Sequence, residues 1–585
     1  MNGEAVPVVV PDNFSEYKQL NPELFPEGTS EEQQHKIYSA TLQVKKTVKK
    51  CKVASGTVNA PAPHREWKIT INDMRLQDQT ETALDALADI NDPPFLFHRS
   101  RGLVRIGYDE KGMPLIEPLN EAALRGIIER CCQFQYLNKK GEEKPISPPK
   151  DVIQDIATLP YWNSIYPLAG IIECPYISRD NCLTTDQGYS QATRLYYAPP
   201  PGFISPSIPD NPKEADIKNS IELLEEIYHD FPFLDKASRT NTIATLICSI
   251  LRPMIDGPVP MALINKPQAG VGASKIAETI AIAATGRPAS MMTAPSSESE
   301  WRKKITSTLQ NGRSIAIIDN IENQLYAPSL AALLTANMWE DRLLGISKNV
   351  SLPHRMQWIG TGNNILLGGD LPRRCYMVNL RSDSARPWQR DESRFKHSQL
   401  LEWVSANRSR IIAAVLTLAR AWIRAGRPDP GKSIPKTGGF EEWRFIVGGI
   451  VVKAGLPDFL GNLEEMYQQS DFDGPQWEIF FERWYQKYGD TSTTVAAIVK
   501  DLKDHENAAQ QTFTDPLSLL DVLPDSLLEA WNGKKSFARV FGNRLAKMNG
   551  RIFVNGCKLV KSDVAHSAVS WKVEMTEPEK GELVK

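Results

Sequence analysis

Residues 261–276 combine an apolar stretch, a glycine-rich turn and a hydroxyl in the arrangement that binds phosphate groups. In the motif G-x-x-x-x-G-K-[ST], glycines let backbone N–H groups close around phosphates, a lysine neutralises their charge and the hydroxyl meets Mg²⁺. Gly272 and Ser274 fit this motif, whereas Pro267 stands in the position of the first glycine and Ala273 in the position of the lysine. The residue types therefore indicate nucleotide triphosphate chemistry at an altered loop.

The missing lysine would cost a charge-assisted contact worth about 1.5–3 kcal/mol, or roughly 10–100-fold in affinity, if nothing replaced it. Lys275 lies two residues after Ala273, about 200° around a helix, so it reaches the phosphates only if the loop register shifts. Lys266 precedes the turn and could fold back over it. Both lysines stay candidates, and the predicted nucleotide-binding set is Gly270, Val271, Gly272, Ala273, Ser274, Lys275 and Lys266.

Two further apolar runs end in polar residues that suit the same chemistry. Residues 314–321 are continuously apolar up to Asp319, as expected for a central strand buried on both faces. Residues 356–362 form a third such strand and lead into Asn363 and Asn364. Asp319, with Ser274, would hold Mg²⁺, and an asparagine would orient an attacking water.

Adjacent arginines, Arg373 and Arg374, stand immediately before a fourth apolar run. Arginines in that position are well placed to project across a subunit boundary and to stabilise the charge of a transferring phosphate. Taken singly, the pair could equally be a surface feature.

Taken together, these segments resemble the AAA+ ATPases, and more closely the helicase-like proteins of phages, plasmids and integrated elements described as primase-helicases. The resemblance spans about residues 90–560 and is carried by the stretches Pro267-Gln-Ala-Gly-Val-Gly, Glu300-Trp-Arg-Lys, Ile318-Asp-Asn, Trp339-Glu-Asp-Arg-Leu-Leu-Gly, Thr361-Gly-Asn-Asn and Leu371-Pro-Arg-Arg.

The resemblance implies ATP and Mg²⁺ as cofactors, a Walker A loop at residues 270–274, a Walker B acid at Asp319 and a sensor at Asn363 or Asn364. It also implies trans-acting arginines among Arg342, Arg373 and Arg374, and a homo-oligomeric ring, usually of six subunits. One departure concerns the general base, because Asn320 follows Asp319 where a glutamate is usual, and the nearest glutamate is Glu322.

Two segments are candidates for DNA contact. Residues 343–353 alternate like a hairpin after a helix ending near Trp339, with Lys348 at the polar tip. Residues 534–561 hold eight basic residues and no acid, combining a helix with apolar residues on one face and a predicted hairpin around Asn555-Gly556. A solvated basic face is the alternative for both, and the predicted DNA contacts are Lys348, Lys534, Lys535, Arg539, Arg544, Lys547, Arg551 and Lys558.

Length and composition indicate that the chain folds into several domains. At 585 residues and 41% hydrophobic content, the chain is too long to fold around a single hydrophobic core. The absence of long uncharged apolar runs predicts a cytoplasmic protein without a membrane partner. With a net charge of −2, contact with nucleic acid would need local basic patches. Predicted regions are an unassigned N-terminal region 1–88, an accessory α+β domain 89–207, an AAA+ core with a helical lid 208–430, a helical connector 431–490 and a winged-helix-like DNA-binding domain 491–585.

The expected fold is therefore multidomain α/β: a P-loop core with a parallel sheet flanked by helices, an N-terminal α+β domain and a C-terminal winged helix. The expected function is ATP-dependent unwinding of, or translocation along, single-stranded or forked DNA during replication of a mobile element. The alternative is a DNA-binding scaffold that binds nucleotide without hydrolysing it. Primer synthesis is expected to reside in a separate primase, because residues 1–200 show no convincing polymerase motif or zinc finger.

Overall fold

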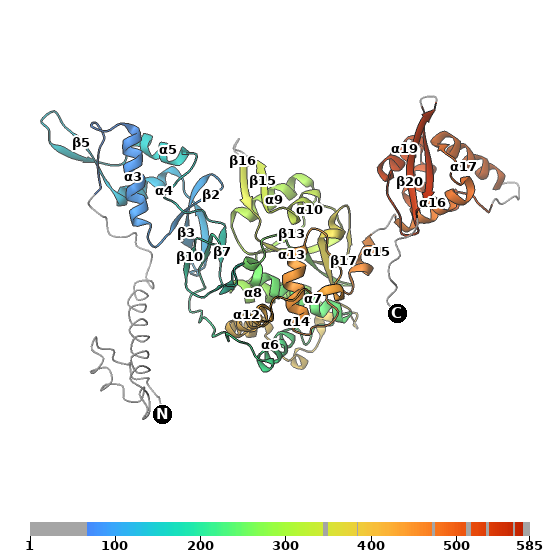
Figure 1. Ribbon diagram of the computed structural model, residues 1–585, viewed down its shortest axis with the longest axis horizontal. Helices are drawn as coiled ribbons and strands as arrows, with labels where there is room; N and C mark the ends of the chain where they lie inside the picture. Colours follow the sequence, from blue (N-terminus) through green and yellow to red (C-terminus); the bar gives the residue numbers. More distant parts are fainter. Residues whose placement is uncertain are drawn as a thin grey trace. The chain divides into compact units, whose positions relative to one another are not determined.

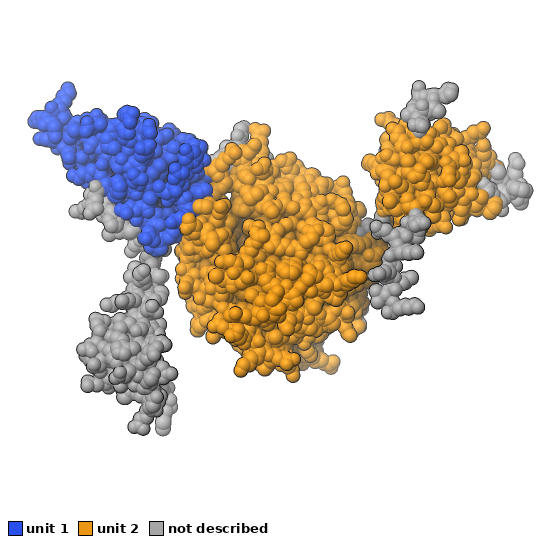
Figure 2. Space-filling model, viewed as in Figure 1, with its two compact units in different colours: residues 1–98, 102–105, 118–166 blue, residues 99–101, 106–117, 167–585 orange. Residues whose placement is uncertain are grey.

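The computed structural model describes residues 67–342, 349–382, 384–470, 474–509, 516–533, 537–565 and 568–576 (Figure 1). The chain divides into two compact units, the first formed by residues 1–98, 102–105 and 118–166 and the second by the remainder (Figure 2). The predicted boundary at residue 88 falls inside helix α3 (Leu76–Ile90). Residues 167–207, predicted to belong to the accessory domain, belong to the second unit.

The first unit has its own core. Strands β1 (Lys68–Thr70), β5 (Gln133–Leu137) and β6 (Glu143–Ile146) form one sheet, with β1 and β5 parallel and β5 and β6 antiparallel. Apolar side chains of α3 and of the sheet pack with those of α4 (Glu121–Cys131) and α5 (Lys150–Thr158). Strands β2 (Leu96–Arg99), β3 (Gly102–Tyr108) and β4 (Pro114–Pro118) form a three-stranded sheet, whose residues are divided between the two units.

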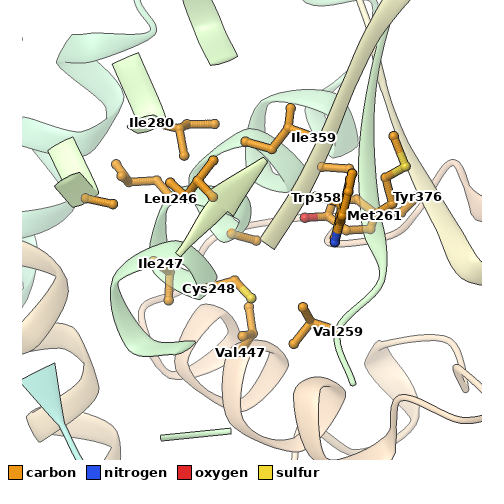
Figure 3. Packing of buried hydrophobic residues seen from close by; sticks show 14 of the residues in the cluster. Leu246, Ile247, Cys248, Val259, Met261, Ile280, Trp358, Ile359, Tyr376 and Val447 are labelled. Atoms are coloured by element: carbon orange, nitrogen blue, oxygen red, sulfur yellow. The ribbon is translucent and has the colours of Figure 1, made fainter. Parts of the chain in front are cut away.

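The second unit is built on a five-stranded sheet in the order β13-β14-β17-β12-β18, in which every neighbouring pair is parallel. Its strands are buried and mostly apolar, as expected when helices cover both faces. Figure 3 shows side chains of this core, including Met261, Trp358 and Ile359. The strand bounds are β12 Met261–Lys266, β13 Met291–Thr293, β14 Ile315–Leu325, β17 Gln357–Leu367 and β18 Cys375–Asn379.

Helix α7 (Lys236–Leu251) is buried along nearly its whole length, although many of its residues are polar. Its polar side chains are satisfied internally: Asn241 donates to the Met377 carbonyl at 2.8 Å, and the Thr245 and Tyr376 hydroxyls lie 2.8 Å apart. The spacing of polar residues in the sequence does not show whether they form internal hydrogen bonds or face solvent. The other helices of this layer are α6 Glu214–Ile227, α8 Ala273–Thr285, α9 Glu298–Gln310, α10 Pro328–Leu334, α11 Leu400–Ala406 and α12 Arg408–Arg424.

The predicted connector 431–490 is not a separate region. Trp443, Ile446 and Met466 lie in the core of the parallel-sheet region, whereas Trp477 and Phe480 lie in a different core. The boundary between the two cores falls between residues 470 and 474, because the apolar residues before it pack in the parallel-sheet core and those after it pack in the C-terminal core. The elements on the first side are α13 Glu441–Trp443, the π-helical turn η7 Arg444–Gly448, α14 Gly449–Lys453 and α15 Leu463–Ser470.

The C-terminal core packs helices against a small sheet in the order β19-β21-β20. Phe480, Trp484, Phe541 and Leu559 are fully buried there. The helices are α16 Gly474–Tyr488, α17 Val495–Ala509, α18 Asp525–Asn532 and α19 Phe537–Met548, and the strands are β19 Thr493–Thr494, β20 Cys557–Ala565 and β21 Ala568–Met575.

The remaining elements are short. They are β7 Gly170–Ile172, β8 Tyr176–Ile177, β9 Leu183–Thr184, β10 Gly188–Ser190, β11 Leu195–Tyr197, β15 Met338–Arg342 and β16 Asn349–Pro353, with 3₁₀ turns η2 Arg252–Met254, η3 Leu371–Arg374, η4 Pro387–Gln389, η5 Glu392–Arg394 and η6 Gly431–Ser433. Among the described residues, none of the helices combines the length and apolarity that crossing a membrane requires.

Candidate functional site

The glycine loop lies between β12 and α8, at the carboxyl edge of the parallel sheet, where such sheets bind ligands. Gly270 and Gly272 have φ of +82° and +114°, which side chains other than glycine rarely adopt. There is also no room for a side chain, since a Cβ on Gly270 would lie 3.0 Å from the Trp388 backbone nitrogen. Both glycines are therefore required by conformation, and Gly272 is the N-cap of α8.

Ser274 and Asp319 lie side by side, although 45 residues separate them. The Ser274 hydroxyl donates to Asp319 Oδ1 at 2.9 Å, and the Thr361 hydroxyl donates to the same oxygen at 2.6 Å. A hydroxyl beside a carboxylate is a donor set that suits Mg²⁺, which prefers oxygen ligands and usually takes only one or two carboxylates beside waters and phosphates. These side chains fit the ion.

The sequence predicts Asp319 at the end of its strand. In the structure it lies in the middle of β14. Pairing with β17 continues beyond it after a β-bulge, because Ile318 pairs with Gly360 and Ile321 with Gly362. Asn320 is the bulged residue, with φ of +56°, and its side-chain amide donates to Glu322 Oε1 at 2.9 Å. β17 likewise continues past Asn363 and Asn364 to Leu367.

The bulge decides which face of the sheet Glu322 occupies. Glu322 pairs with Asn363, and Lys266 of β12 pairs with Asn363 from the other side. Residues paired across neighbouring strands point to the same face, and residues two apart on one strand do so as well. Thr361, which contacts Asp319, is two residues before Asn363. Lys266, Asn363, Glu322 and Asp319 therefore share the face on which α8 packs.

Three polar residues of β12 and β17 have further features. Lys266 is only 8% exposed. The Asn363 Oδ1 atom is buried without a hydrogen-bond partner in the part of the chain that the structure describes. Asn364 is exposed and also has a positive φ, of +46°.

A cavity of about 350 Å³ lies beside the glycine loop. Gly270, Gly272, Ala273 and Ser274 form one side of it, and both candidate lysines, Lys266 and Lys275, line it. Asp319, Glu322 and Asn363 are not among its lining residues. The cavity is thus adjacent to the loop and not between the loop and the carboxylates.

The opposite wall comes from the segment after β18 and was not predicted from the sequence. Arg390 donates to the Val271 carbonyl at 3.0 Å, and its guanidinium lies 5.4 Å from the centre of the Phe395 ring. Trp388 packs on Gly270, and His397 stacks on Trp403 while contacting Glu226 at 3.0 Å. The wall residues Trp388, Arg390, Phe395 and His397 lie in short turns without periodicity. The only sequence signal for them was the density of aromatic and basic residues in this segment.

The predicted trans-acting arginines lie away from the loop. β18 begins at Cys375, which pairs with Met261 at the amino end of β12, so Arg373 and Arg374 precede the opposite edge of the sheet. Both arginines form ion pairs with Asp370. Arg374 also donates to the Ala331 carbonyl, whereas the Arg373 side chain is 76% exposed. Arg342 ends β15, opposite Asn349 of β16.

The predicted hairpin at residues 343–353 begins earlier than expected. Its strands are β15 and β16, so Trp339 lies in a strand and not at a helix end, and helix α10 ends at Leu334. The indole of Trp339 donates to Thr306 at 2.9 Å, which anchors the first strand on α9. Lys348 lies outside the described residues.

The predicted C-terminal helix is present as α19, with Phe537, Phe541, Leu545 and Met548 buried. Arg539 and Lys547 are exposed on it and Arg544 is half-buried. Lys534 and Lys535 lie outside the described residues.

The predicted hairpin around Asn555-Gly556 is present only as a short turn, in which Ile552 and Lys558 form an antiparallel bridge and the Phe553 N–H donates to the Cys557 carbonyl at 2.8 Å. The longer hairpin is formed by the eight residue pairs between β20 and β21, which the sequence analysis does not predict. Arg551 lies before β20, and Lys558 lies within it, opposite Glu574.

No protein-family model matches the chain, and no curated protein matches it. Two solved structures with the titles "The A form apo structure of NrS-1 C terminal region-CTR" and "The A form apo structure of NrS-1 C terminal region-CTR(305-718)" are similar over 80% of this chain and 95% and 96% of theirs. Both are 10% identical in sequence, with TM-scores of 0.36 and 0.33.

Proposed function

We propose that the chain is an ATPase of the AAA+ type that acts on DNA. The observation that carries this proposal is the 2.9 Å contact between Ser274 of the glycine loop and Asp319 of a neighbouring strand, at the carboxyl edge of a parallel sheet. The strand order, with β12 between β17 and β18, is compatible with a P-loop core. The role in replication of a phage, plasmid or integrated element rests on the resemblance of the motif set alone.

In this proposal Ser274 and Asp319 hold Mg²⁺, which would neutralise charge on the bound phosphates. The backbone N–H groups around Gly270, Val271 and Gly272 bind phosphate oxygens. Glu322 accepts the proton of the attacking water, and Asn363, whose Oδ1 has no partner among the described residues, orients that water. Asn320 positions Glu322 through their 2.9 Å hydrogen bond.

Lys266 is the stronger candidate for the missing lysine. It ends β12 directly before the loop, lines the adjacent cavity and shares a sheet face with Asn363 and Glu322. Lys275 is exposed at the third position of α8 and lines the same cavity. A lysine held in the sheet loses less conformational entropy on contacting a phosphate than an exposed one does.

The position of Arg373 favours a ring. Because it precedes the sheet edge opposite the subunit's own glycine loop and is largely exposed, it would serve the nucleotide of a neighbouring subunit. Arg374, held by Asp370 and the end of α10, would position that turn. A hexameric homo-oligomer is the assembly we propose.

The C-terminal core supports a DNA-binding module of winged-helix type. A helix with exposed basic residues, α19, precedes two long antiparallel strands, and a third short strand completes the sheet. Arg539, Arg544 and Lys547 would contact phosphates of single-stranded or forked DNA. Lys558, opposite Glu574, is a weaker candidate than the sequence suggests.

The test is steady-state ATP hydrolysis by the full chain with and without single-stranded DNA. The motor predicts turnover that DNA stimulates, and a decrease to background in Asp319→Asn, which keeps the shape of the side chain but removes its charge. Thr361→Ser, which retains the hydroxyl next to Asp319, is the matched control and should remain active. Turnover that persists in Asp319→Asn would reject the site.

A second candidate function is a DNA-binding scaffold that binds nucleotide without turnover. Ala273 in place of the loop lysine and the packing of Trp388 on Gly270 favour it. This candidate predicts saturable ATP binding by calorimetry, with no phosphate release above the no-enzyme rate in the same samples.

A further inference from the structure

A second cavity, of about 230 Å³, lies at the amino edge of the parallel sheet, opposite the edge with the glycine loop. Ser314 and Met356, which immediately precede β14 and β17, form part of its wall, together with the turn after α7. It shares no lining residue with the cavity beside the glycine loop. Five arginines line it: Arg99, Arg179, Arg252, Arg313 and Arg355.

The charges in this cavity are unbalanced. Among the described residues, Asp256 is the only acidic residue that lines it, and it already pairs with Arg179 and Arg355, each at 2.8 Å. Glu442 is not among the lining residues but lies 4.0 Å from Arg179, so five guanidinium groups are matched by two nearby carboxylates. Arg313 is half-buried, and burial lowers its pKa.

Arg99 and Arg252 are the most deeply buried of the five, at 7% and 3% exposure. Both donate only to backbone carbonyls: Arg99 to Leu309 and Gln310 at 2.9 and 3.0 Å, and Arg252 to Ile255, Gly257 and His354 at 2.7 to 3.4 Å. The Nε atom of each is buried and has no partner within the described ranges.

Burial lowers the pKa of Arg99 and of Arg252 to about 10, so both stay charged at neutral pH. A buried charge is costly, and carbonyl dipoles offset only part of that cost, although Glu442 and Asp256 also act on Arg252. Capping of the α9 carboxyl end explains the Arg99 Nη contacts. It does not explain why Arg179, Arg313 and Arg355 line the same cavity as Arg99 and Arg252.

We propose that this cavity binds a phosphate-class oxyanion. Guanidinium groups bind phosphate through paired N–H donors, and a group of five provides more positive charge than Asp256 and Glu442 together can balance. The volume is below the roughly 300–1,000 Å³ of sites for drug-sized ligands, so it suits a phosphate or diphosphate group better than a whole nucleotide. The source is either a free anion or a phosphate of a nucleic-acid strand. This inference does not depend on the proposed ATPase.

The experiment is calorimetric titration of the full chain with pyrophosphate at constant ionic strength, set by chloride. The test variant is Arg179→Gln/Arg313→Gln, which changes the half-buried Arg313 and a side chain that is 68% exposed, and leaves Arg99 and Arg252 in place. We expect its Kd to rise by roughly 10–100-fold, the effect of losing charge-assisted contacts. Circular dichroism checks that the variant is folded.

Two controls separate this cavity from other anion sites. Arg75→Gln removes the same charge from a side chain that is 79% exposed and should leave the Kd within about twofold, since exposed pairs contribute little. Ser274→Ala removes the hydroxyl of the glycine loop that would hold Mg²⁺ and should also leave the high-affinity Kd unchanged. Hydrogen exchange should slow at residues 252–256 and 309–314 when pyrophosphate binds.

Oligonucleotides with and without a 5′-phosphate identify the source. Displacement of pyrophosphate by either strand indicates a nucleic-acid phosphate, and failure of both to displace it indicates a free anion. The proposal is overturned if the double variant binds as the unmodified chain does, if Ser274→Ala alone abolishes binding, or if millimolar pyrophosphate neither binds nor protects these segments.

Discussion

Lys266 is a lysine at the end of a strand, 8% exposed, next to a loop that lacks its usual cation. We predict that Lys266→Ala raises the Kd for ATP by roughly 10–100-fold, because it removes the charge-assisted contact that replaces the absent lysine. Lys275→Ala, one turn into the adjacent helix, is the matched control and should change the Kd by less than about threefold. Calorimetry with a non-hydrolysable ATP analogue measures both. A larger loss in Lys275→Ala would assign the role to Lys275 instead.

His354 makes stability depend on pH. It is buried, its Nε2 accepts from the Trp358 indole at 3.0 Å and its Nδ1 lies 3.0 Å from the Ala336 carbonyl. Burial lowers its pKa to about 4. A depressed pKa contributes stability that is complete above the unfolded value near 6.5 and is lost as the pH falls towards 4, because the unfolded chain takes up a proton that the folded chain excludes.

The free energy of unfolding should therefore decrease between pH 6.5 and pH 4, by up to about 1.4 kcal/mol per pH unit from this group alone. Urea unfolding of the unmodified chain and of His354→Gln at several pH values measures the difference. His354→Gln should be less stable at pH 7 but less sensitive to pH. Equal slopes for the two chains would contradict this prediction.

At the scale of elements, the bulge in β14 determines whether Glu322 faces the site. Asn320 has φ of +56°, which a β-branched side chain tolerates poorly. We predict that Asn320→Val destabilises the fold by about 1–3 kcal/mol and decreases ATP hydrolysis, because relief of the strain would shift the register and turn Glu322 to the other face.

Asn320→Gly is the control for the bulge, since glycine adopts positive φ without strain. It should keep the fold, and hydrolysis should decrease only by the loss of the hydrogen bond to Glu322. Thermal unfolding and phosphate release measure the two effects. Full activity in Asn320→Val would show that the face of Glu322 is irrelevant.

At the scale of the whole molecule, the C-terminal core is built from its own apolar residues and carries the described part of the basic segment 534–561. We predict that Arg539→Ala and Lys547→Ala each weaken DNA binding by the full chain across sequences. Each should decrease the slope of log K against log [salt] by about one unit, because each removes one phosphate contact.

Fluorescence anisotropy with single-stranded and forked DNA over a range of salt concentrations measures these slopes. Lys503→Ala changes an exposed lysine of α17, outside the basic segment, and should leave the slope unchanged. If the slope is unaltered in both α19 variants, the basic residues of α19 face solvent and do not contact DNA.

Much of this protein is determined locally by its sequence. The glycine loop between β12 and α8, the buried strands around Asp319 and Asn363, and the apolar face of α19 follow from periodicity and from the backbone freedom of glycine, which act within a few residues. Those features were sufficient to predict the α/β class with a parallel sheet and to select Ser274 and Asp319 as neighbours.

The tertiary structure decided what depends on register and on distant partners. Glu322 stands three residues after Asp319, a spacing that would place it on the opposite face of a regular strand, and only the bulge at Asn320 returns it to the same face. The packing of Arg390 against the glycine loop and the convergence of five arginines on one cavity likewise join segments whose contacts no local pattern encodes. Side chains far apart in the chain become neighbours only when the sheet and its covering helices have packed.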